Sequence, residues 1–267
     1  AASAGILGDM PRLDYSGGVS CPSLLLEPAR TNLFQNSEYF SASTWQGITG
    51  GTLTENDATS PEGVQNATKI EGDGSSTAIR LFDFQNVSSA GDYSFSFFAK
   101  AGTANFIQIS LLGYDGGGQA SFDLSNGTID DAANGSIEDY GNGWYRCTCI
   151  KSIGATDLTG SANLYVRKSL TANWDTAAEA NGKNVYIYGA QMEAGSYPTS
   201  YVPSYGSATA RAAEPSALNK SDLISDGFFS SSELTWFIDV DLYQRDGGST
   251  VAPRLISSSN NQVFIGF

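Results

Sequence analysis

The sequence contains no histidine and only three cysteines. Ser-His-Asp and Cys-His catalytic arrangements are therefore excluded, and zinc is disfavoured because a second Cys pair is also missing. Three cysteines cannot form a disulfide framework, since one is always left over. Cys147 and Cys149 lie two apart in "GWYRCTCIK", so on a strand they point to one face, too far apart for an unstrained bridge. We expect small buried thiols and assembly in a reducing cytoplasm.

Basic residues are also scarce. Lys and Arg number 14 against 28 Asp and Glu, giving a net charge of −14. This balance argues against nucleic-acid binding, which needs cations to displace counterions from phosphates, and against anionic membrane surfaces. No run approaches the roughly 18 apolar residues of a membrane span, so no membrane insertion is expected. Neutral polymers, cations and other proteins remain as partners.

What the chain does contain is glycine and alternating apolar residues. There are 30 glycines, 12% aromatic residues and little helical periodicity. Short runs alternate between apolar and polar positions, as strands do: "DYSFSFFAK", "NFIQISLLGY", "GNGWYRCTCIKSI", "SANLYVRKSL" and "KNVYIYGAQM". Turn signals separate them, and Asn126-Gly127 and Asn142-Gly143 each predict a two-residue hairpin turn. The pattern predicts an all-β fold, an antiparallel β-sandwich, with a jelly roll as the favoured version.

The chain is expected to have three parts. Residues 1–31 are irregular and proline-containing, which indicates an extended N-terminal connector. Residues 32–213 form the sandwich. From residue 214 the pattern restarts, with Trp236, Ile238 and Val240 alternating along "LTWFIDVDLYQ". Residues 214–267 are therefore expected to begin a second β domain that is incomplete at Phe267.

Three stretches resemble a known family: "PRLDYSGGVSCPSLLLEPARTNLFQNSEYFSASTW", "NGWYRC" and "VYIYGAQMEAGSYPTSYVPSYGSATARAAE". Together they are similar to a module of tailed-phage tail-fibre, tail-spike and head-fibre-like structural proteins, which looks like a carbohydrate-binding jelly roll. Residues 214–267 resemble the start of a concanavalin A-like lectin or laminin-G-like domain. The resemblance implies a virion appendage, assembled in the host cytoplasm, that forms a homotrimer or other homo-oligomer with further virion proteins and recognises host-surface polysaccharide.

Sugar binding needs aromatic platforms flanked by polar groups. Trp45, Tyr114 and Trp174 lie in turn-like or glycine-rich surroundings and are the candidates, against the alternative that they cap or anchor the sandwich. For catalysis the most acidic doublet is Asp130-Asp131. Neighbours on a strand point to opposite faces, so this pair is a poor acid/base pair and a solvated turn is favoured. We expect no enzymatic activity.

Two further sets of residues are candidates. The resemblance implies a structural Ca²⁺ near the first and last strands, where Glu38 and Glu193 would meet, although no calcium-binding loop is present. We expect residues 195–205 to run in extended form over the edge of the module. Exposed aromatic and apolar residues suit oligomer contacts, with coverage of their own chain as the equal alternative. These interface candidates are Leu24, Leu25, Leu26, Tyr197, Tyr201 and Tyr205.

The leading hypothesis from the sequence is a non-enzymatic phage appendage for assembly and glycan recognition. An accessory carbohydrate-binding module of a secreted polysaccharide lyase or glycoside hydrolase is the second. A purely architectural role without a ligand is the third.

Overall fold

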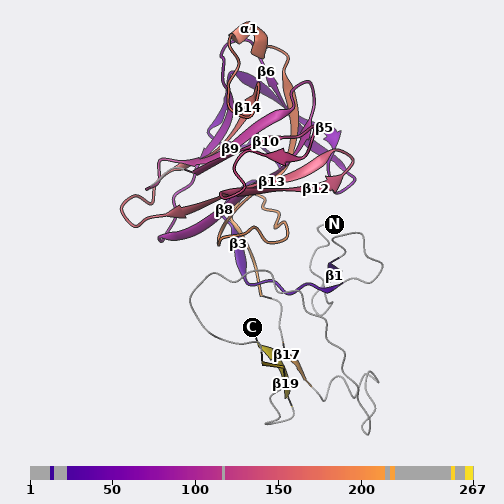
Figure 1. Ribbon diagram of the computed structural model, residues 1–267, viewed down its shortest axis with the longest axis vertical. Coiled ribbons are helices and arrows are strands. Elements are labelled where there is room, and N and C mark those ends of the chain that lie inside the picture. Colours follow the sequence, from indigo (N-terminus) through magenta and orange to yellow (C-terminus); the bar gives the residue numbers. More distant parts are fainter. Residues whose placement is uncertain are drawn as a thin grey trace. The chain divides into compact units, whose positions relative to one another are not determined.

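The computed structural model describes residues 13–14, 23–115, 118–213, 217–219, 254–255 and 262–266, with side chains for 25–115 and 118–213 (Figure 1). The chain divides into two compact units. Residues 29–211 belong to the first. The second contains two small antiparallel sheets: β1 (Leu13–Asp14) with β2 (Ser23–Leu24), and β17 (Ala217–Asn219), β19 (Gln262–Gly266) and β18 (Arg254–Leu255), in the order β17-β19-β18. The predicted strand at Trp236 lies outside the described residues.

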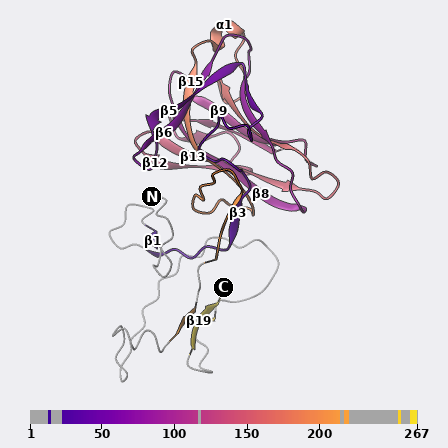
Figure 2. The ribbon, with the colours of Figure 1, turned by 180° about the vertical axis from the view of Figure 1, so that it is seen from behind.

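Two six-stranded antiparallel sheets form the first unit (Figures 1 and 2). Sheet I contains, in spatial order, β11 (Thr128–Ile129), β10 (Gly118–Asp123), β9 (Phe106–Leu112), β14 (Ser161–Arg167), β7 (Ile79–Phe84) and β4 (Gly47–Thr49). Sheet II contains, in spatial order, β12 (Gly135–Gly141), β13 (Trp144–Ile153), β8 (Gly91–Ala101), β15 (Asn184–Ala194), β6 (Gln65–Gly72) and β5 (Gly51–Thr59). The predicted all-β antiparallel sandwich of jelly-roll type is confirmed.

Apolar side chains of the two sheets meet between them, as strand alternation requires. Ile107, Ile109 and Leu111 of β9 point inward and are fully buried, as predicted. Cys147 and Cys149 are also buried and unbridged, which confirms the prediction for both thiols. Their burial raises the pKa of both, to about 12 for Cys149.

The two predicted asparagine–glycine turns differ. Asn142 and Gly143 both have positive φ, 54° and 80°, and join β12 to β13 directly, as expected for a two-residue hairpin. At the second site β10 and β11 do form a hairpin, but Phe122 pairs with Ile129 and only Gly127 of the loop has positive φ. This pairing leaves a loop of more than two residues. Within it the Asp123 carboxylate accepts hydrogen bonds from the backbone N–H of Ser125 and the side chain of Asn126, which stabilises the longer turn.

A single helical turn, α1 (Ala177–Ala180), lies at one end of the sandwich (Figure 1). Thr176 caps it by accepting a hydrogen bond from the backbone N–H of Glu179. Strand β3 (Arg30–Asn32) lies at the opposite end in both ribbon views and pairs with β16 (Thr209–Arg211). In the part of the chain that the structure describes, no helix has the length and apolar character to cross a membrane.

Strand β8 is buried on both faces, although its alternation of apolar and polar residues is typical of a strand with one buried face. Tyr93, Phe95 and Phe97 face the core, yet Ser94 and Ser96 on the opposite face are also buried, at 1% and 0% exposure. The reason is that residues 196–205 pack over the outer face of sheet II rather than along the edge of the module. Tyr201 from this segment packs edge-on against Phe98, at a ring-centroid distance of 5.8 Å.

The buried carboxamide of Asn32 connects three parts of the chain: the end of β3, β15, and the segment 196–205 that packs over sheet II. Its Nδ2 donates to the carbonyl oxygens of Ala190 and Val202, and its Oδ1 accepts from the backbone N–H groups of Phe34 and Met192. Ala190 belongs to a bulge in β15, where Gly189 has φ +62° and a Cβ would approach Phe98 to 2.9 Å. The Asn32 side chain thus holds together the end of β3, the bulge of β15 and residues 196–205, which we call the covering segment.

We predict that Asn32→Ala lowers the free energy of unfolding by about 3 kcal/mol, because it leaves buried carbonyl and N–H groups unpaired. Urea denaturation monitored by fluorescence measures this change. Asn173→Ala is the matched control, since Asn173 is exposed in a loop, and we expect it to stay within about 0.5 kcal/mol of the wild type. Equal unfolding midpoints for the two variants would contradict the role assigned to Asn32.

Candidate functional site

The structure places Trp45 and Tyr114 in the core, so neither offers a ring face to a sugar. Trp45 is 5% exposed, stacks on Phe34 at 4.9 Å between ring centroids, and donates its indole N–H to the Asn36 carbonyl. Tyr114 is also 5% exposed and donates its hydroxyl to the Gln85 carbonyl. These two assignments are corrected: a glycine-rich sequence around an aromatic residue does not tell whether the ring folds inward.

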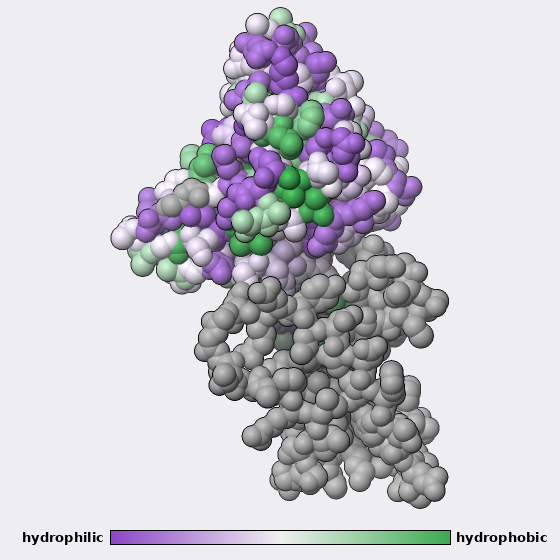
Figure 3. Space-filling view, in the orientation of Figure 1, coloured by the Kyte–Doolittle hydropathy of each residue, from purple (hydrophilic) through white to green (hydrophobic). Residues whose placement is uncertain are grey.

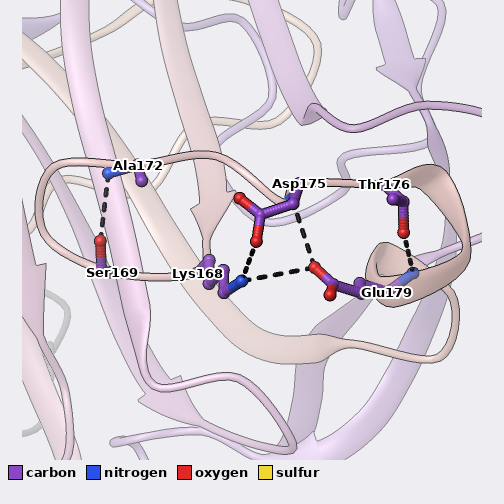
Figure 4. A network of polar contacts seen from close by, with 6 residues as sticks. All are labelled: Lys168, Ser169, Ala172, Asp175, Thr176 and Glu179. Carbon is purple, nitrogen blue, oxygen red and sulfur yellow. Dashed lines mark hydrogen bonds and ion pairs between the residues drawn. The ribbon is translucent and has the colours of Figure 1, made fainter.

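Trp174 lines an open pocket beside α1, together with Lys168, Ala178, Glu179, Asn181 and Lys183. The indole is half-buried and packs against the core, and the Lys183 ammonium lies 5.7 Å from its ring centroid. Lys168 bonds to Asp175 and Glu179, as Figure 4 shows. Trp174 therefore keeps an accessible position, with Lys168 and Glu179 already paired and Lys183 beside its ring.

The predicted calcium ligands have separate partners. Glu38 accepts hydrogen bonds from the hydroxyls of Tyr188, Tyr201 and Tyr205. Glu193 is fully buried and accepts from the backbone N–H and the hydroxyl of Thr199. Among the described residues no group of three or more His, Cys, Asp or Glu side chains could hold a metal ion. The geometry thus assigns both carboxylates to anchoring the covering segment.

The predicted interface residues differ in how far they are exposed. Tyr201 covers its own sandwich, packing against Phe98 and Tyr188. Tyr197 and Tyr205 are 45% and 69% exposed, and the Arg30 guanidinium lies over the Tyr197 ring at 5.4 Å. Leu25 and Leu26 are half-buried, while the side chain of Leu24 lies outside the described residues. An interface role for the leucines stays a prediction.

The outer face of sheet I reaches solvent and carries aromatic and polar side chains that the sequence analysis did not select. Phe84 is 62% exposed. Arg80, Phe82, Tyr165 and Arg167 are half-buried on the same face. Figure 3 shows that hydrophobic residues gather in places on the visible surface of the sandwich among hydrophilic ones.

Strand register arranges these side chains in rows, because cross-strand partners share a face. One row runs Ser121, Gln108, Tyr165 and Arg80, from β10 through β9 and β14 to β7. The next row runs Gln119, Ser110, Asn163 and Phe82 over the same strands. Small and amide side chains thus fill the middle of the face, with aromatic rings and arginines beside them.

The two arginines are held by amides. The Asn163 carboxamide oxygen accepts from Nε and Nη2 of Arg80 at 2.8 and 2.5 Å, and the Gln108 amide oxygen accepts from Nη1 of Arg167 at 2.5 Å. Asn163 is fully buried and its Nδ2 donates to the Ser161 carbonyl at 2.9 Å. A buried amide therefore fixes the orientation of each guanidinium.

Rings complete the face. Phe82 and Phe84 lie 5.7 Å apart at 84°, and the Arg80 guanidinium stacks over Phe82 at 4.1 Å. Phe82 is thus covered on one side, and the Arg80 guanidinium also lies 5.8 Å from the centroid of the Tyr165 ring. Phe84 is the exposed ring of this face, while Tyr165 is half-buried. Flat apolar rings beside fixed donors and amides are the groups that bind sugar faces and hydroxyls. The alternation in "IRLFDF" and "SANLYVR", with large residues on both faces, was the sequence signal for this site.

The chain matches no protein-family model and no curated protein. Among solved structures, the enzymatically active domain of bacteriophage CBA120 tailspike protein 4 aligns with 14% identity and a TM-score of 0.37, covering 61% of this chain and 21% of that chain. TmCBM61, solved with beta-1,4-galactotriose, aligns at 12% identity and a TM-score of 0.39, covering 61% and 99%. The CBM22-2 xylan-binding domain from Paenibacillus barcinonensis Xyn10C aligns at 12% identity and 0.37, covering 62% and 98%.

This chain therefore spans about a fifth of the tailspike chain and nearly all of the two smaller modules. At these identities and TM-scores, functional conclusions have to rest on the geometry of this chain itself.

A buried carboxyl group, Asp83, lies close to the Tyr114–Gln85 hydrogen bond and makes stability depend on pH. Asp83 is 5% exposed near Gln85, and burial raises its pKa from 3.8 to about 6. The folded state then binds this proton more tightly than the unfolded state, so the stabilisation is present below about pH 4 and is lost as the pH rises through about 6. The loss amounts to about 2–3 kcal/mol, at 1.36 kcal/mol per pKa unit.

Asp83→Asn removes this titration while keeping the side-chain shape. Denaturation curves between pH 4 and pH 8 should show the wild type losing stability relative to the variant as the pH rises. Parallel profiles for the two proteins would show that the buried carboxyl does not titrate as described.

Proposed function

We propose that the jelly roll is a glycan-binding module and that the outer face of sheet I is its binding surface. The observation that carries this proposal is the difference between the two outer faces. Residues 196–205 of the chain itself cover the part of sheet II around Phe98 and Gln191, whereas sheet I presents Phe84, Tyr165 and two amide-held arginines. The exposed rings supply area, and the fixed polar groups supply direction.

We further propose a non-enzymatic role for this module. The buried Cys147 and Cys149 have raised pKa values, so they are poor thiolate nucleophiles. Asp130 accepts from the backbone N–H of Ser121, and Asp131 from the side chain of Asn134, which supports the solvated-turn interpretation of this doublet. These contacts leave neither carboxylate positioned opposite the other as an acid/base pair.

The biological setting that we propose is a phage virion appendage, a tail fibre, tail spike or head fibre, assembled in the host cytoplasm. The three sequence stretches that resemble such modules support it. Several copies in a homotrimer or other homo-oligomer would convert weak sugar contacts into useful avidity. An accessory module of a secreted polysaccharide lyase or glycoside hydrolase is the alternative, and it would use the same sugar-binding face.

Phe84→Ala should weaken glycan binding about tenfold, because an aromatic contact contributes about 0.5–1.5 kcal/mol beyond its buried area and 1.4 kcal/mol corresponds to a factor of ten. A bacterial-polysaccharide array followed by titration calorimetry on the best ligand measures this. Tyr39→Ala is the matched control, since Tyr39 is 54% exposed and lies outside sheet I.

We expect Tyr39→Ala to bind like the wild type. Equal losses in both variants would mean that the ligand does not use the face of sheet I. Absence of any polysaccharide ligand would favour the purely architectural role.

Light scattering after size exclusion separates the two settings. A phage appendage is expected to elute as a multiple of the 28.1 kDa chain. A monomer at all concentrations would instead favour the accessory module.

A further inference from the structure

We infer that the outer face of sheet I selects acidic glycans, recognising sugar carboxylates through Arg80 and Arg167. This inference rests on the proposed glycan binding and adds the chemical class of the ligand. The protein carries a net charge of −14, yet this face places two guanidinium groups among its rings.

Neither guanidinium is neutralised by a carboxylate. Lys69 and Lys168 form ion pairs with acidic side chains, whereas the hydrogen bonds of Arg80 and Arg167 go to the neutral amides Asn163 and Gln108. An amide orients a guanidinium but leaves its full charge in place. Among the described residues neither guanidinium forms a direct ion pair, although Asp130 lies near enough to Arg167 for its charge to act on it.

The carboxylates closest to this face have other partners. Asp130 lies near Arg167, and its charge counteracts the effect of burial, which lowers the pKa of Arg167. Its Oδ1 accepts from the backbone N–H of Ser121 at 2.7 Å. Asp123 at the edge of the face accepts from Ser125 and Asn126. A ligand carboxylate could thus bind the guanidiniums without displacing a protein ion pair.

Burial also disfavours the Arg167 cation in the free protein. The Nε atom of Arg167 is buried without a hydrogen-bond partner among the described residues. A nearby anion favours a buried cation, so a carboxylated ligand recovers part of this desolvation penalty. A neutral sugar would not recover it.

Register places the two arginines on neighbouring strands of one face. Arg80 of β7 pairs with Tyr165 of β14, and Arg167 lies two residues after Tyr165 in β14. The two arginines are therefore diagonal neighbours across the two strands. Such neighbours are about 7–8 Å apart at their Cα atoms. The Arg80 guanidinium lies on Asn163 and over Phe82, and that of Arg167 lies on Gln108. An acidic oligosaccharide lying across the face can therefore bring carboxylates to either guanidinium, and Arg–carboxylate hydrogen bonds are strong and directional.

The net negative charge does not prevent this recognition. At physiological ionic strength, exposed charges further away than about 8 Å are largely screened. The two arginines on the face then determine the local interaction, while acidic residues elsewhere act weakly.

The experiment compares uronic-acid oligosaccharides, namely oligogalacturonate and oligomannuronate, with their carboxyl-reduced neutral counterparts in calorimetric titrations. We expect the wild type to bind at least one acidic oligomer at least tenfold more tightly than its neutral counterpart. Arg80→Gln/Arg167→Gln should abolish this preference, because binding of the acidic oligomers then falls at least tenfold further than binding of their neutral counterparts. Arg80→Lys/Arg167→Lys, which keeps the charge, should retain part of the preference.

Lys69→Gln/Lys100→Gln is the matched control, because it removes the same charge from sheet II and should leave the preference unchanged. Thermal melts verify that each variant is folded. Equal binding of acidic and neutral oligomers by the wild type overturns the acidic selectivity while glycan binding stands. Retention of the preference by the glutamine variant overturns the role of the arginines. Failure to bind any oligomer of either series, or any polysaccharide on the array, overturns glycan binding as well.

Discussion

The hydrogen bonds of the buried Asn32 carboxamide are the interaction on which the arrangement of this module depends. They connect β3 to the bulge of β15 and to the segment after β15, and the carboxamide uses donors and acceptor together. Because the groups are buried, each would be costly if left unpaired. Gly189 makes the connection geometrically feasible, since its positive φ turns the strand beneath Phe98 and Tyr201. One amide therefore holds the covering segment in position.

Because Asn32 holds the covering segment against sheet II, the outer faces of the two sheets differ. The segment at 196–205 covers outer side chains of sheet II around Phe98, and Glu193 and Gln191 bind its backbone at Thr199 and Val202. Polar residues on that face thereby become structural. The outer face of sheet I keeps its rings and arginines accessible, so the two chemically similar faces take different roles.

Amide side chains have a second task on sheet I. Asn163 and Gln108 orient Arg80 and Arg167 without neutralising them, which leaves charge available for a ligand. This differs from the Trp174 pocket, where Lys168 is already paired with Asp175 and Glu179. Two places with lysine or arginine beside an aromatic ring thus differ in what they can still bind.

The sequence by itself determined β8, β9, β13, β14 and β15, the antiparallel sandwich, the buried pair Cys147 and Cys149, and the turn at Asn142-Gly143, because alternation and turn chemistry act over a few residues. It did not determine which aromatic residues stay accessible. Trp45 and Tyr114 had sequence surroundings typical of a binding loop and are buried, whereas Phe84 came from an ordinary strand and is exposed. Only the tertiary structure decided this, because exposure depends on which sheet face the chain covers, and that covering joins residues more than 150 positions apart, as Asn32 does with Ala190.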